Sequence, residues 1–452
     1  QTQTFGHVTG MKQVAVMTTP SGEWIENDVS RFKLNQSMYK AFVLRRIKHL
    51  HSPLSRLLST QQQQSNEQTK WREEAIFYVH DTRLFLVKET ETLLKLSNIK
   101  TIKSVFFGGG TPSLAEPLTI QSVLETVERC THLIPGAEIT LEANPTSAES
   151  TKLREFKDAG VNRLSLGIQS LIDEDLRVLG RQHSITEALN CLEIAKSLFP
   201  GRTSVDIIFG RPSQQLTVWE EELDEVLNLC NDHLSVYQLT LEKGTVLFKQ
   251  VMERVLLLPP QEMIDDMYEL LVEKSAQRGY HRYEVSNFAK HHSSESIHNK
   301  GYWQSIQYIG VGPARIQTLV PDRWMSEVER YGHGTQKVTP QTEHTVLQEV
   351  IMLGMRTAAG ITDKQWRIFT DIGLRDVFGE SRMVRVLKDE GYLEFSKAKG
   401  RFLKGDAAVA TQYWASHSDW VIDPCPSVVA TLYHPVPYAT VVPPLCRDCK
   451  AL

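Results

Sequence analysis

Four short apolar runs between residues 105 and 210 end in glycine or polar residues. They are VFFGGGTP at residues 105–112, LEANP at 141–145, LGIQS at 166–170 and VDIIFG at 205–210. Each run has the length of a buried strand, and the loops that follow parallel strands in a β/α fold share one face. We therefore expect the residues at these four strand ends to form one ligand site.

The residue types at these strand ends suit a charged, nucleoside-like ligand. Glycines let the backbone approach a ligand closely, because no Cβ intervenes. Two carboxylates and an amide could bind ribose hydroxyls and an ammonium or sulfonium group, and the arginine of LGRQH could pair with a carboxylate through its planar fork. The candidates are Gly109, Gly110, Thr111, Glu142, Gln169, Arg181 and Asp206. For each residue alone, a structural turn or a solvated surface position is the alternative.

Strand and helix patterns alternate from residue 74 to residue 312. The segment EAIFYVH at residues 74–80 predicts a first strand, and residues 82–96 predict a helix directly after it. Further helices are predicted at residues 120–130, 151–159, 186–198, 219–229 and 260–278. One helix between successive strands is what a parallel β/α array requires. The predicted fold class is therefore α/β, with an incomplete (β/α)6 barrel.

The pattern after residue 339 predicts a small second domain. Helices are predicted at residues 345–355, 363–369 and 381–390, ahead of the strand-like GYLEF at 391–395. Helices that end in a short hairpin indicate a winged-helix-like domain. Beyond residue 414 the chain becomes proline-rich and loses periodicity, which predicts an unstructured tail. The expected boundaries are 67–330 for the barrel, 331–412 for the C-terminal domain and 413–452 for the tail.

The first 66 residues predict two segments. Residues 1–25 show neither periodicity nor a turn pattern, and we interpret residues 1–37, which precede Met38, as an unassigned leader that is not native to the protein. Residues 38–66 contain no Asp or Glu, while Arg45, Arg46 and Lys48 stand among apolar residues. This is the composition of a mitochondrial transit peptide, followed by a glutamine-rich linker. A basic surface helix on a cytosolic protein is the alternative.

The composition of the whole chain excludes several classes of protein. With 41% hydrophobic and 23% charged residues over 452 positions, it is that of an ordinary globular protein. A formal net charge of -4 gives no general attraction to nucleic acid, and no run of about 18 apolar residues predicts a membrane span. Six cysteines scattered over this length favour a reducing compartment over a disulfide framework.

In order and spacing, these blocks resemble the radical S-adenosylmethionine (radical SAM) family. HRYEVSNFA at residues 281–289, HNKGYW at 298–303 and EVIMLGMR at 349–356 resemble its branch with oxygen-independent coproporphyrinogen III oxidase and the heme chaperone HemW, and the first two favour the chaperone. The resemblance extends from residue 75 to residue 405. It implies a radical SAM barrel, S-adenosylmethionine and a 4Fe-4S iron–sulfur cluster as cofactors, and Tyr78 beside S-adenosylmethionine.

The resemblance also implies a heme site in the HNKGYW block. A neutral imidazole such as that of His298 is a common axial heme ligand, and Tyr302 and Trp303 offer flat apolar surface to a porphyrin. Asn299 belongs to the same block. The alternative is that His298 and Asn299 hydrogen-bond a barrel loop while the two aromatic residues belong to the core. The two histidines at residues 291–292 fit an exposed polar loop.

The cluster-binding motif of the family, C-x3-C-x2-C, is missing after residues 78–80. Three thiolates bind three irons of such a cluster and leave the fourth iron for S-adenosylmethionine. None of the six cysteines has this spacing, and Cys446 and Cys449 lie in the aperiodic tail, so no metal site is predicted. GVGPARIQ at residues 310–317 also lacks the Ala-His of the branch. These gaps indicate a segment omitted from the sequence; a cluster-free isoform or paralogue is the alternative.

By resemblance, the sequence predicts a mitochondrial heme chaperone that binds heme for transfer to acceptor proteins. A coproporphyrinogen III oxidase-like radical enzyme and a cluster-free binding protein are the alternatives, so no enzymatic activity is assigned. Neither nucleic acid nor a membrane span is expected, and a homodimer is left open.

Overall fold

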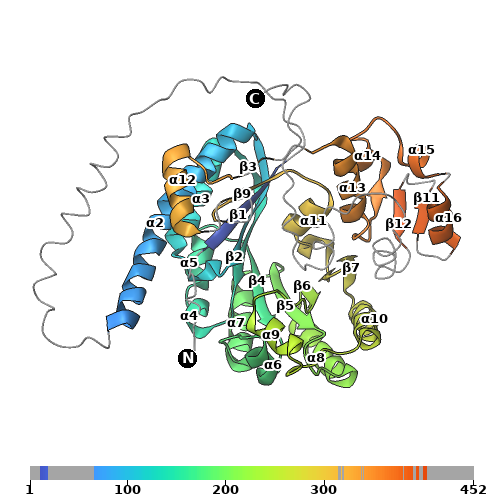
Figure 1. Ribbon diagram of the computed structural model, residues 1–452, viewed down its shortest axis with the longest axis horizontal. Helices are drawn as coiled ribbons and strands as arrows, with labels where there is room; N and C mark the ends of the chain where they lie inside the picture. Colours follow the sequence, from blue (N-terminus) through green and yellow to red (C-terminus); the bar gives the residue numbers. More distant parts are fainter. Residues whose placement is uncertain are drawn as a thin grey trace, which may run out of the picture.

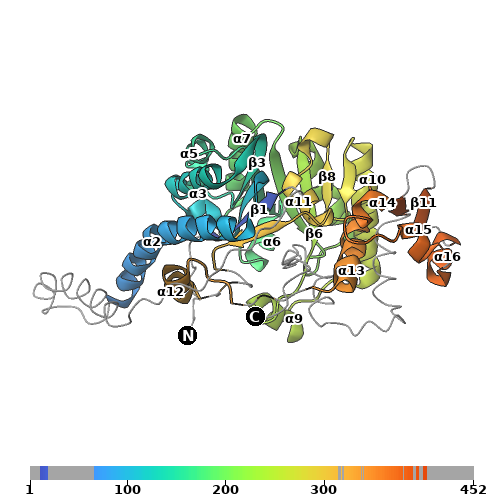
Figure 2. The same ribbon diagram turned by 90° about the horizontal axis from the view of Figure 1, so that it is seen from above.

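The computed structural model describes residues 11–18, 66–313, 317, 320–336, 338, 341–379, 381–389, 393–396 and 401–404. Within these residues, a large curled sheet carries helices along its outer side, and a smaller unit of helices and short strands lies beside it (Figure 1; Figure 2). The predicted transit peptide and tail lie outside the described residues, except for Asn66. None of the described helices has the length and apolar content needed to cross a membrane.

Five parallel strands form the centre of the described large sheet. They are β2 (Thr101–Gly110), β3 (His132–Ala143), β4 (Arg163–Gln169), β5 (Thr203–Phe209) and β6 (His233–Gln238). The helices between and after them are η1 (Pro112–Leu114), α3 (Pro117–Cys130), α4 (Ser147–Ser150), α5 (Leu153–Asp158), α6 (Asp173–Val178), α7 (Ile185–Leu198), α8 (Leu216–Leu229), α9 (Val246–Met252) and α10 (Gln261–Gln277). The predicted alternation of strand and helix is confirmed over this region.

The main core lies between this sheet and its outer helices. Strand residues such as Leu141, Leu164 and Val205 are buried in the same apolar cluster as Ile120 of α3 and Leu192 of α7. Successive side chains of a strand point to opposite faces, so the residues between these apolar ones face the other side. Burying one large apolar side chain stabilises the fold by about 1.5–3 kcal/mol. This core therefore fixes the register of the strands, and with it the residues of the opposite face.

Four further strands complete the described sheet. They are β1 (Met11–Thr18), β7 (His281–Glu284), β8 (Asn287–Ala289) and β9 (Tyr308–Val311). The strand order is β7-β8-β6-β5-β4-β3-β2-β1-β9, and β1 pairs antiparallel with both β2 and β9. No element was predicted for residues 1–37, although Gly10 precedes the alternating MKQVAVMT and Pro20 and Gly22 follow it, which is the pattern that bounds a strand.

The strand predicted at residues 74–80 is wrong. These residues lie within α2 (Asn66–Ser97), which continues through the helix predicted at 82–96. A short apolar run is ambiguous between strand and helix, and no turn residue separates this one from the helical pattern that follows. The described sheet consequently has five parallel strands instead of six, with β1 beside β2.

Glu89 of α2 joins this helix to distant parts of the chain. Its buried carboxylate accepts a hydrogen bond from Nε1 of Trp324 in α12 (Pro321–Tyr331) at 2.9 Å. It also accepts from the backbone N–H groups of Gly312 and Gly334, each at 2.7 Å. Three donors on one buried carboxylate offset the cost of removing it from water. Glu89 therefore holds α2 against α12 and against the segment that follows β9.

The smaller unit has a core of its own. Its helices are α13 (Glu343–Gly354), α14 (Asp363–Trp366), α15 (Leu374–Phe378) and α16 (Arg382–Asp389), and its strands pair in the order β10 (Ile361–Thr362), β12 (Arg401–Lys404), β11 (Leu393–Ser396). Ile361, Trp366 and Leu374 are buried together. An ion pair of 2.8 Å between Arg356 and Glu284 of β7 links this unit to the large sheet. The three predicted helices correspond to α13, α14 and α16, whereas β10 and α15 were not predicted. The predicted domain boundaries stay predictions.

Candidate functional site

The inner face of the large sheet, opposite its helices, carries polar and charged side chains. They alternate with the buried apolar residues along four neighbouring strands. The set comprises Glu138, Thr140, Glu142, Arg163, Ser165, Ser204, Asp206, His233 and Ser235. Strand pairing places Glu142 beside Ser165, Ser204 beside His233 and Asp206 beside Ser235. The polar residues consequently form one continuous surface across the strands.

The glycine turn after β2 folds onto the end of β3. Oε2 of Glu142 accepts a hydrogen bond from the backbone N–H of Gly109 at 3.0 Å. Gly109 and Gly110 have φ angles of 77° and 75°, a left-handed conformation that glycine adopts without strain. Nδ2 of Asn144 donates a hydrogen bond to Oγ1 of Thr111 at 3.3 Å. The structure thus brings together four of the residues predicted for the strand-end site.

Asp206 lies on the same face as Glu142. Its carboxylate accepts hydrogen bonds from Oγ of Ser165 at 2.8 and 3.0 Å and from Oγ of Ser204 at 3.2 Å. Burial raises the pKa of Asp206 to about 6, although these serines act to lower it. Burial also raises the pKa of Glu142 to about 7, and the negative charge of Asp206 adds to the shift. Two coupled carboxyl groups that resist ionisation would be stabilised in their charged form by a cationic ligand.

Arg181 and Gln169 complete the predicted strand-end set. Burial lowers the pKa of the Arg181 guanidinium, and the charge of Asp206 acts to raise it. Nε of Arg181 is buried without a hydrogen-bond partner among the described residues. Gln169 has a φ of 71°, an uncommon conformation for a residue with a side chain, and its amide lies where a Cβ on Gly167 would collide. Tyr78 lies in α2, and its side chain is outside what the structure describes.

His298 lies on α11 (Ile297–Trp303), against the inner face of the sheet. Its buried ring stacks on Phe106 of β2, with centroids 4.0 Å apart and an angle of 10° between planes. Tyr302 meets the same imidazole edge-on at 4.8 Å. Burial lowers the pKa of His298 to about 3, and Nδ1 is buried without a partner among the described residues. The imidazole is therefore neutral at physiological pH, the form in which it binds metals.

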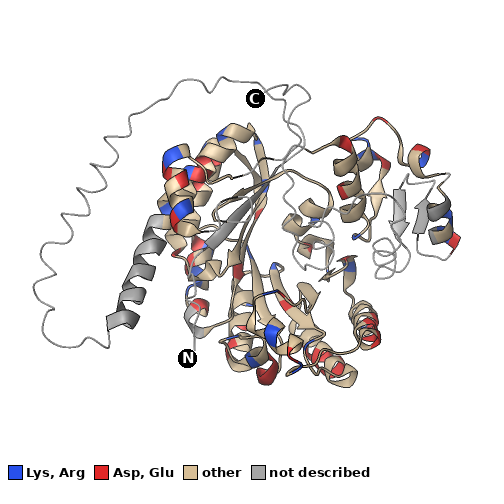
Figure 3. Ribbon diagram, viewed as in Figure 1, with Lys and Arg blue, Asp and Glu red and all other residues tan. Residues whose placement is uncertain are grey.

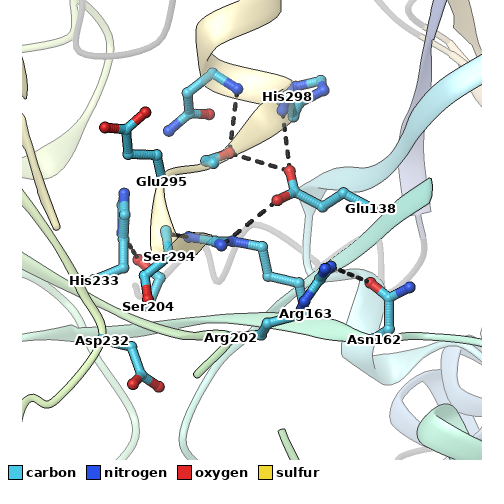
Figure 4. A network of polar contacts seen from close by, with 12 residues as sticks. Glu138, Asn162, Arg163, Arg202, Ser204, Asp232, His233, Ser294, Glu295 and His298 are labelled. Atoms are coloured by element: carbon cyan, nitrogen blue, oxygen red, sulfur yellow. Dashed lines mark hydrogen bonds and ion pairs between the residues drawn. The ribbon is translucent and has the colours of Figure 1, made fainter. Parts of the chain in front are cut away.

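A buried ion pair positions the start of α11 (Figure 4). Oε1 of Glu138 accepts hydrogen bonds from the backbone N–H of His298 at 3.0 Å and from Oγ of Ser296 at 3.4 Å. Oε2 of Glu138 lies 3.5 Å from Nη1 of Arg163, and Nη2 of Arg163 donates to the carbonyl of Ser294 at 2.9 Å. A carboxylate at a helix N-terminus is also favoured by the helix dipole.

The sequence analysis missed both members of this ion pair. Their signal was the alternation of AEITLEA and RLSLG, in which Glu138 and Arg163 occupy inward positions between apolar residues.

Asn299 and Trp303, the other predicted heme residues, have different neighbours. Trp303 is buried, and the Arg356 guanidinium lies 4.8 Å from its ring centroid. Nδ2 of Asn299 donates a hydrogen bond to Oδ1 of Asn287 at 3.1 Å. The structure therefore brings His298 and Tyr302 together, whereas Asn299 hydrogen-bonds strand β8 and Trp303 is a buried core residue, as the alternative interpretation expected for the aromatic residue.

Comparison with known proteins identifies the family. The Radical SAM superfamily model matches residues 79–230. The chain is 47% identical over 329 residues to radical S-adenosyl methionine domain-containing protein 1, mitochondrial, of Bos taurus, which covers 69% of this chain and 74% of that protein. This chain belongs to the radical SAM superfamily. Heme chaperone HemW of Bacillus subtilis is 30% identical over 327 residues, covering 67% of the radical SAM chain and 86% of HemW.

A solved structure shares the fold of this radical SAM protein. Coproporphyrinogen III oxidase (HemN) of Escherichia coli is similar over 74% of this chain and 81% of its own, with a TM-score of 0.59. The sequence identity of 18% is low, so this likeness shows the fold alone. It confirms the predicted α/β radical SAM barrel, open on one side.

The described cysteines of this radical SAM protein do not fit a 4Fe-4S cluster. Cys191 and Cys230 are buried in the apolar layer between the sheet and the outer helices, and Cys130 ends α3 on the same side. Burial raises the pKa of the Cys191 thiol to about 12, so it stays protonated. The three cysteines of the tail lie outside the described residues.

The raised pKa of Glu142 predicts how the free energy of unfolding changes with pH. Its folded-state pKa of about 7 exceeds the ordinary 4.5, so its contribution to stability is lost as pH rises from 4.5 through 7. Glu142→Gln keeps an acceptor for the Gly109 N–H and removes the charge. We expect this variant to exceed the parent in free energy of unfolding by about 1–2 kcal/mol at pH 8, allowing for partial solvent screening, and to match it near pH 4.

Urea unfolding at the two pH values measures this difference. Glu128→Gln on the exposed face of α3 is the matched control, and it should leave the pH dependence unchanged. A Glu142→Gln protein with the same pH dependence as the parent would show that burial does not perturb this carboxyl.

Proposed function

We propose that this chain is a mitochondrial heme-binding protein of the HemW type, which holds heme for transfer to acceptor proteins. The observation that carries the proposal is the environment of His298. Its imidazole is buried and neutral, has a ring nitrogen without a partner among the described residues, and contacts the flat rings of Phe106 and Tyr302. The names of relatives support the heme and mitochondrial parts, because they include Heme chaperone HemW and mitochondrial proteins of Bos taurus and Danio rerio.

The proposed heme site uses three kinds of residue. His298 would ligate the iron, while Phe106 and Tyr302 would contact the porphyrin through apolar ring surface. Because the imidazole now stacks on Phe106, heme entry requires these two rings to separate. Glu138 would hold the backbone of His298 during that movement. Asn299 and Trp303 would support α11 from its other sides.

We further propose that the strand-end residues bind S-adenosylmethionine. S-adenosylmethionine carries a positively charged sulfonium, an ammonium, a carboxylate and ribose hydroxyls. Glu142 and Asp206 would attract the positive charge, and Arg181 would pair with the carboxylate. The remaining members of the proposed site are Tyr78, Gly109, Gly110, Thr111 and Gln169. Without cluster thiolates in the described residues, the proposal covers binding and positioning only.

Two alternatives differ from the chaperone in their requirements. A coproporphyrinogen III oxidase-like enzyme would need a radical generated at a cluster, and the described cysteines do not fit one. A cluster-free protein would bind a nucleoside or a porphyrin without radical chemistry, or would bind neither and serve as an interaction module. The proposal has three further parts. Acceptor proteins receive the heme, the chain forms a homodimer, and residues 38–66 direct its import into mitochondria.

Hemin titration followed through the Soret band tests the heme site. His298→Ala is expected to shift the Soret maximum and to weaken hemin binding at least about tenfold, equivalent to about 1.4 kcal/mol, because the axial nitrogen is lost. His344→Ala, on the exposed face of α13, is the matched control and should bind like the parent. If His298→Ala keeps the parental spectrum and affinity, His298 is not the ligand.

A further inference from the structure

A second cluster of imidazoles lies just before α11. Nε2 of His281 in β7 and Nδ1 of His292 in η2 (His292–Ser294) each lie 2.8 Å from the same carboxylate oxygen, Oε1 of Glu295. The two imidazole rings are 4.5 Å apart between centroids. The donor atoms of the three residues all lie within 4.8 Å of one another. These residues come from two segments, β7 at the edge of the sheet and η2 with the residue that follows it.

The other oxygen of Glu295 already has a cationic partner. Nζ of Lys300 lies 2.7 Å from Oε2, so the charge of the carboxylate is balanced without the imidazoles. The carboxylate is 10% exposed and points away from Glu138 (Figure 4). The two imidazoles are therefore not needed to neutralise the charge of Glu295. It does match the donor set of a metal ion, with Lys300 fixing the carboxylate from outside.

We propose that His281, His292 and Glu295 bind one divalent transition-metal ion of the Zn²⁺ class. Two imidazoles and a carboxylate oxygen are borderline and hard ligands that suit Zn²⁺ and Co²⁺ and disfavour Mg²⁺ or Ca²⁺. Zn²⁺ takes such ligands at about 2.0–2.2 Å, which separates neighbouring donors by about 3.3 Å in a tetrahedron. The two 2.8 Å separations from Oε1 of Glu295 need to open by only a few tenths of an ångström. The two imidazole nitrogens, which lie within 4.8 Å of each other, reach the same spacing by a small rotation of the exposed His292 side chain.

The proposed site keeps a fourth position for water. The His292 side chain is 89% exposed and that of His281 is 34% exposed, so the ion is reached from solvent without unfolding. The ion would join β7 and η2 to the residue that precedes Ser296, whose side chain caps α11. Metal binding would thus stabilise the start of the helix that carries His298. The site itself does not depend on heme.

Cobalt titration of the heme-free full chain tests the proposal. Cys446→Ser and Cys449→Ser are introduced in every protein, so that the tail contributes no thiolate. We expect one Co²⁺ per chain with the visible d–d absorption of a four-coordinate site, displaced by Zn²⁺. His292→Ala should weaken binding more than about tenfold, and because this side chain is exposed, the variant should fold normally. Glu295→Gln tests the carboxylate ligand.

His291→Ala is the matched control, because His291 is the neighbouring exposed histidine outside the cluster. It should bind Co²⁺ like the parent. Zn²⁺ should raise the thermal midpoint of the parent and of His291→Ala, and leave that of His292→Ala unchanged. The proposal is overturned if no stoichiometric d–d band forms, if His292→Ala binds as tightly as the parent, or if His291→Ala loses as much affinity as His292→Ala.

Discussion

Glu138→Ala is expected to lower the free energy of unfolding by about 3–5 kcal/mol, because it leaves the Arg163 guanidinium buried without its carboxylate. Both side chains of the pair are 2% exposed. The same substitution removes the acceptor for the backbone N–H of His298 and the hydroxyl of Ser296. Urea unfolding at neutral pH measures the loss, which should be among the largest for any single carboxylate of the barrel.

Matched variants separate the contribution of the Glu138 charge to stability from that of its hydrogen bonds. Glu138→Gln keeps an acceptor and should lose less stability than Glu138→Ala. Adding Arg163→Leu to Glu138→Ala should recover part of the loss, because no unpaired charge is then buried. Glu91→Ala removes an exposed carboxylate that pairs with Lys95, and should cost about 0.2–1 kcal/mol. If Glu138→Ala costs no more than Glu91→Ala, the buried pair does not hold this part of the fold.

The Glu138 variant also connects the barrel to the proposed heme site. The amide of His298 should exchange with solvent faster in Glu138→Ala, because its only hydrogen-bond acceptor among the described residues has been removed. Hydrogen exchange of the α11 peptide measures this directly. Slow exchange in both proteins would mean that the sheet does not position His298.

The proximity of the Gly109 turn, Glu142 and Asp206 could be predicted because parallel strands place their C-terminal ends at one edge. The ion pair between Glu138 and Arg163 was harder to predict, although both residues occupy inward positions in strands whose polar and apolar residues alternate. Pairing of β3 with β4 sets Arg163 beside Thr140 and not beside Glu138, so partners follow from register and side-chain reach. Local sequence patterns do not determine either of these quantities.

Helical periodicity could have separated the members of the HNKGYW block. His298 and Tyr302 are four residues apart and share a helix face, whereas Trp303 is five residues from His298 and lies on another side. The observed contacts follow this rule, because the His298 ring contacts the Tyr302 ring while Trp303 lies against the Arg356 guanidinium. The prediction treated the block as one surface because no helix had been assigned to it. The missed strand β1 and the mistaken strand at residues 74–80 have a different cause, since short apolar runs carry little information about their conformation.

Anaerobic reconstitution with iron and sulfide is expected to leave this chain without a 4Fe-4S cluster. A cluster needs three thiolates that converge on one point, and Cys130, Cys191 and Cys230 belong to the helical side of the sheet, two of them buried in its core. Iron and sulfide analysis, the visible spectrum and the EPR spectrum after reduction measure the outcome. A radical SAM protein that retains C-x3-C-x2-C, treated in parallel, shows that the conditions support assembly.

Replacing two cysteines of the tail tests whether a cluster, if one forms, is held by the tail. Cys446 and Cys449 are separated by two residues, the spacing of one half of a thiolate site, and they lie outside the described residues. If a stoichiometric cluster forms, Cys446→Ser with Cys449→Ser decides its origin, because a cluster held by the tail must then disappear. A cluster that survives this double substitution would have to draw its ligands from the barrel, and the assignment of the barrel cysteines to the core would be wrong. If none forms, hemin binding that the same preparation shows and His298→Ala loses would mean that the heme site at His298 functions independently of radical chemistry.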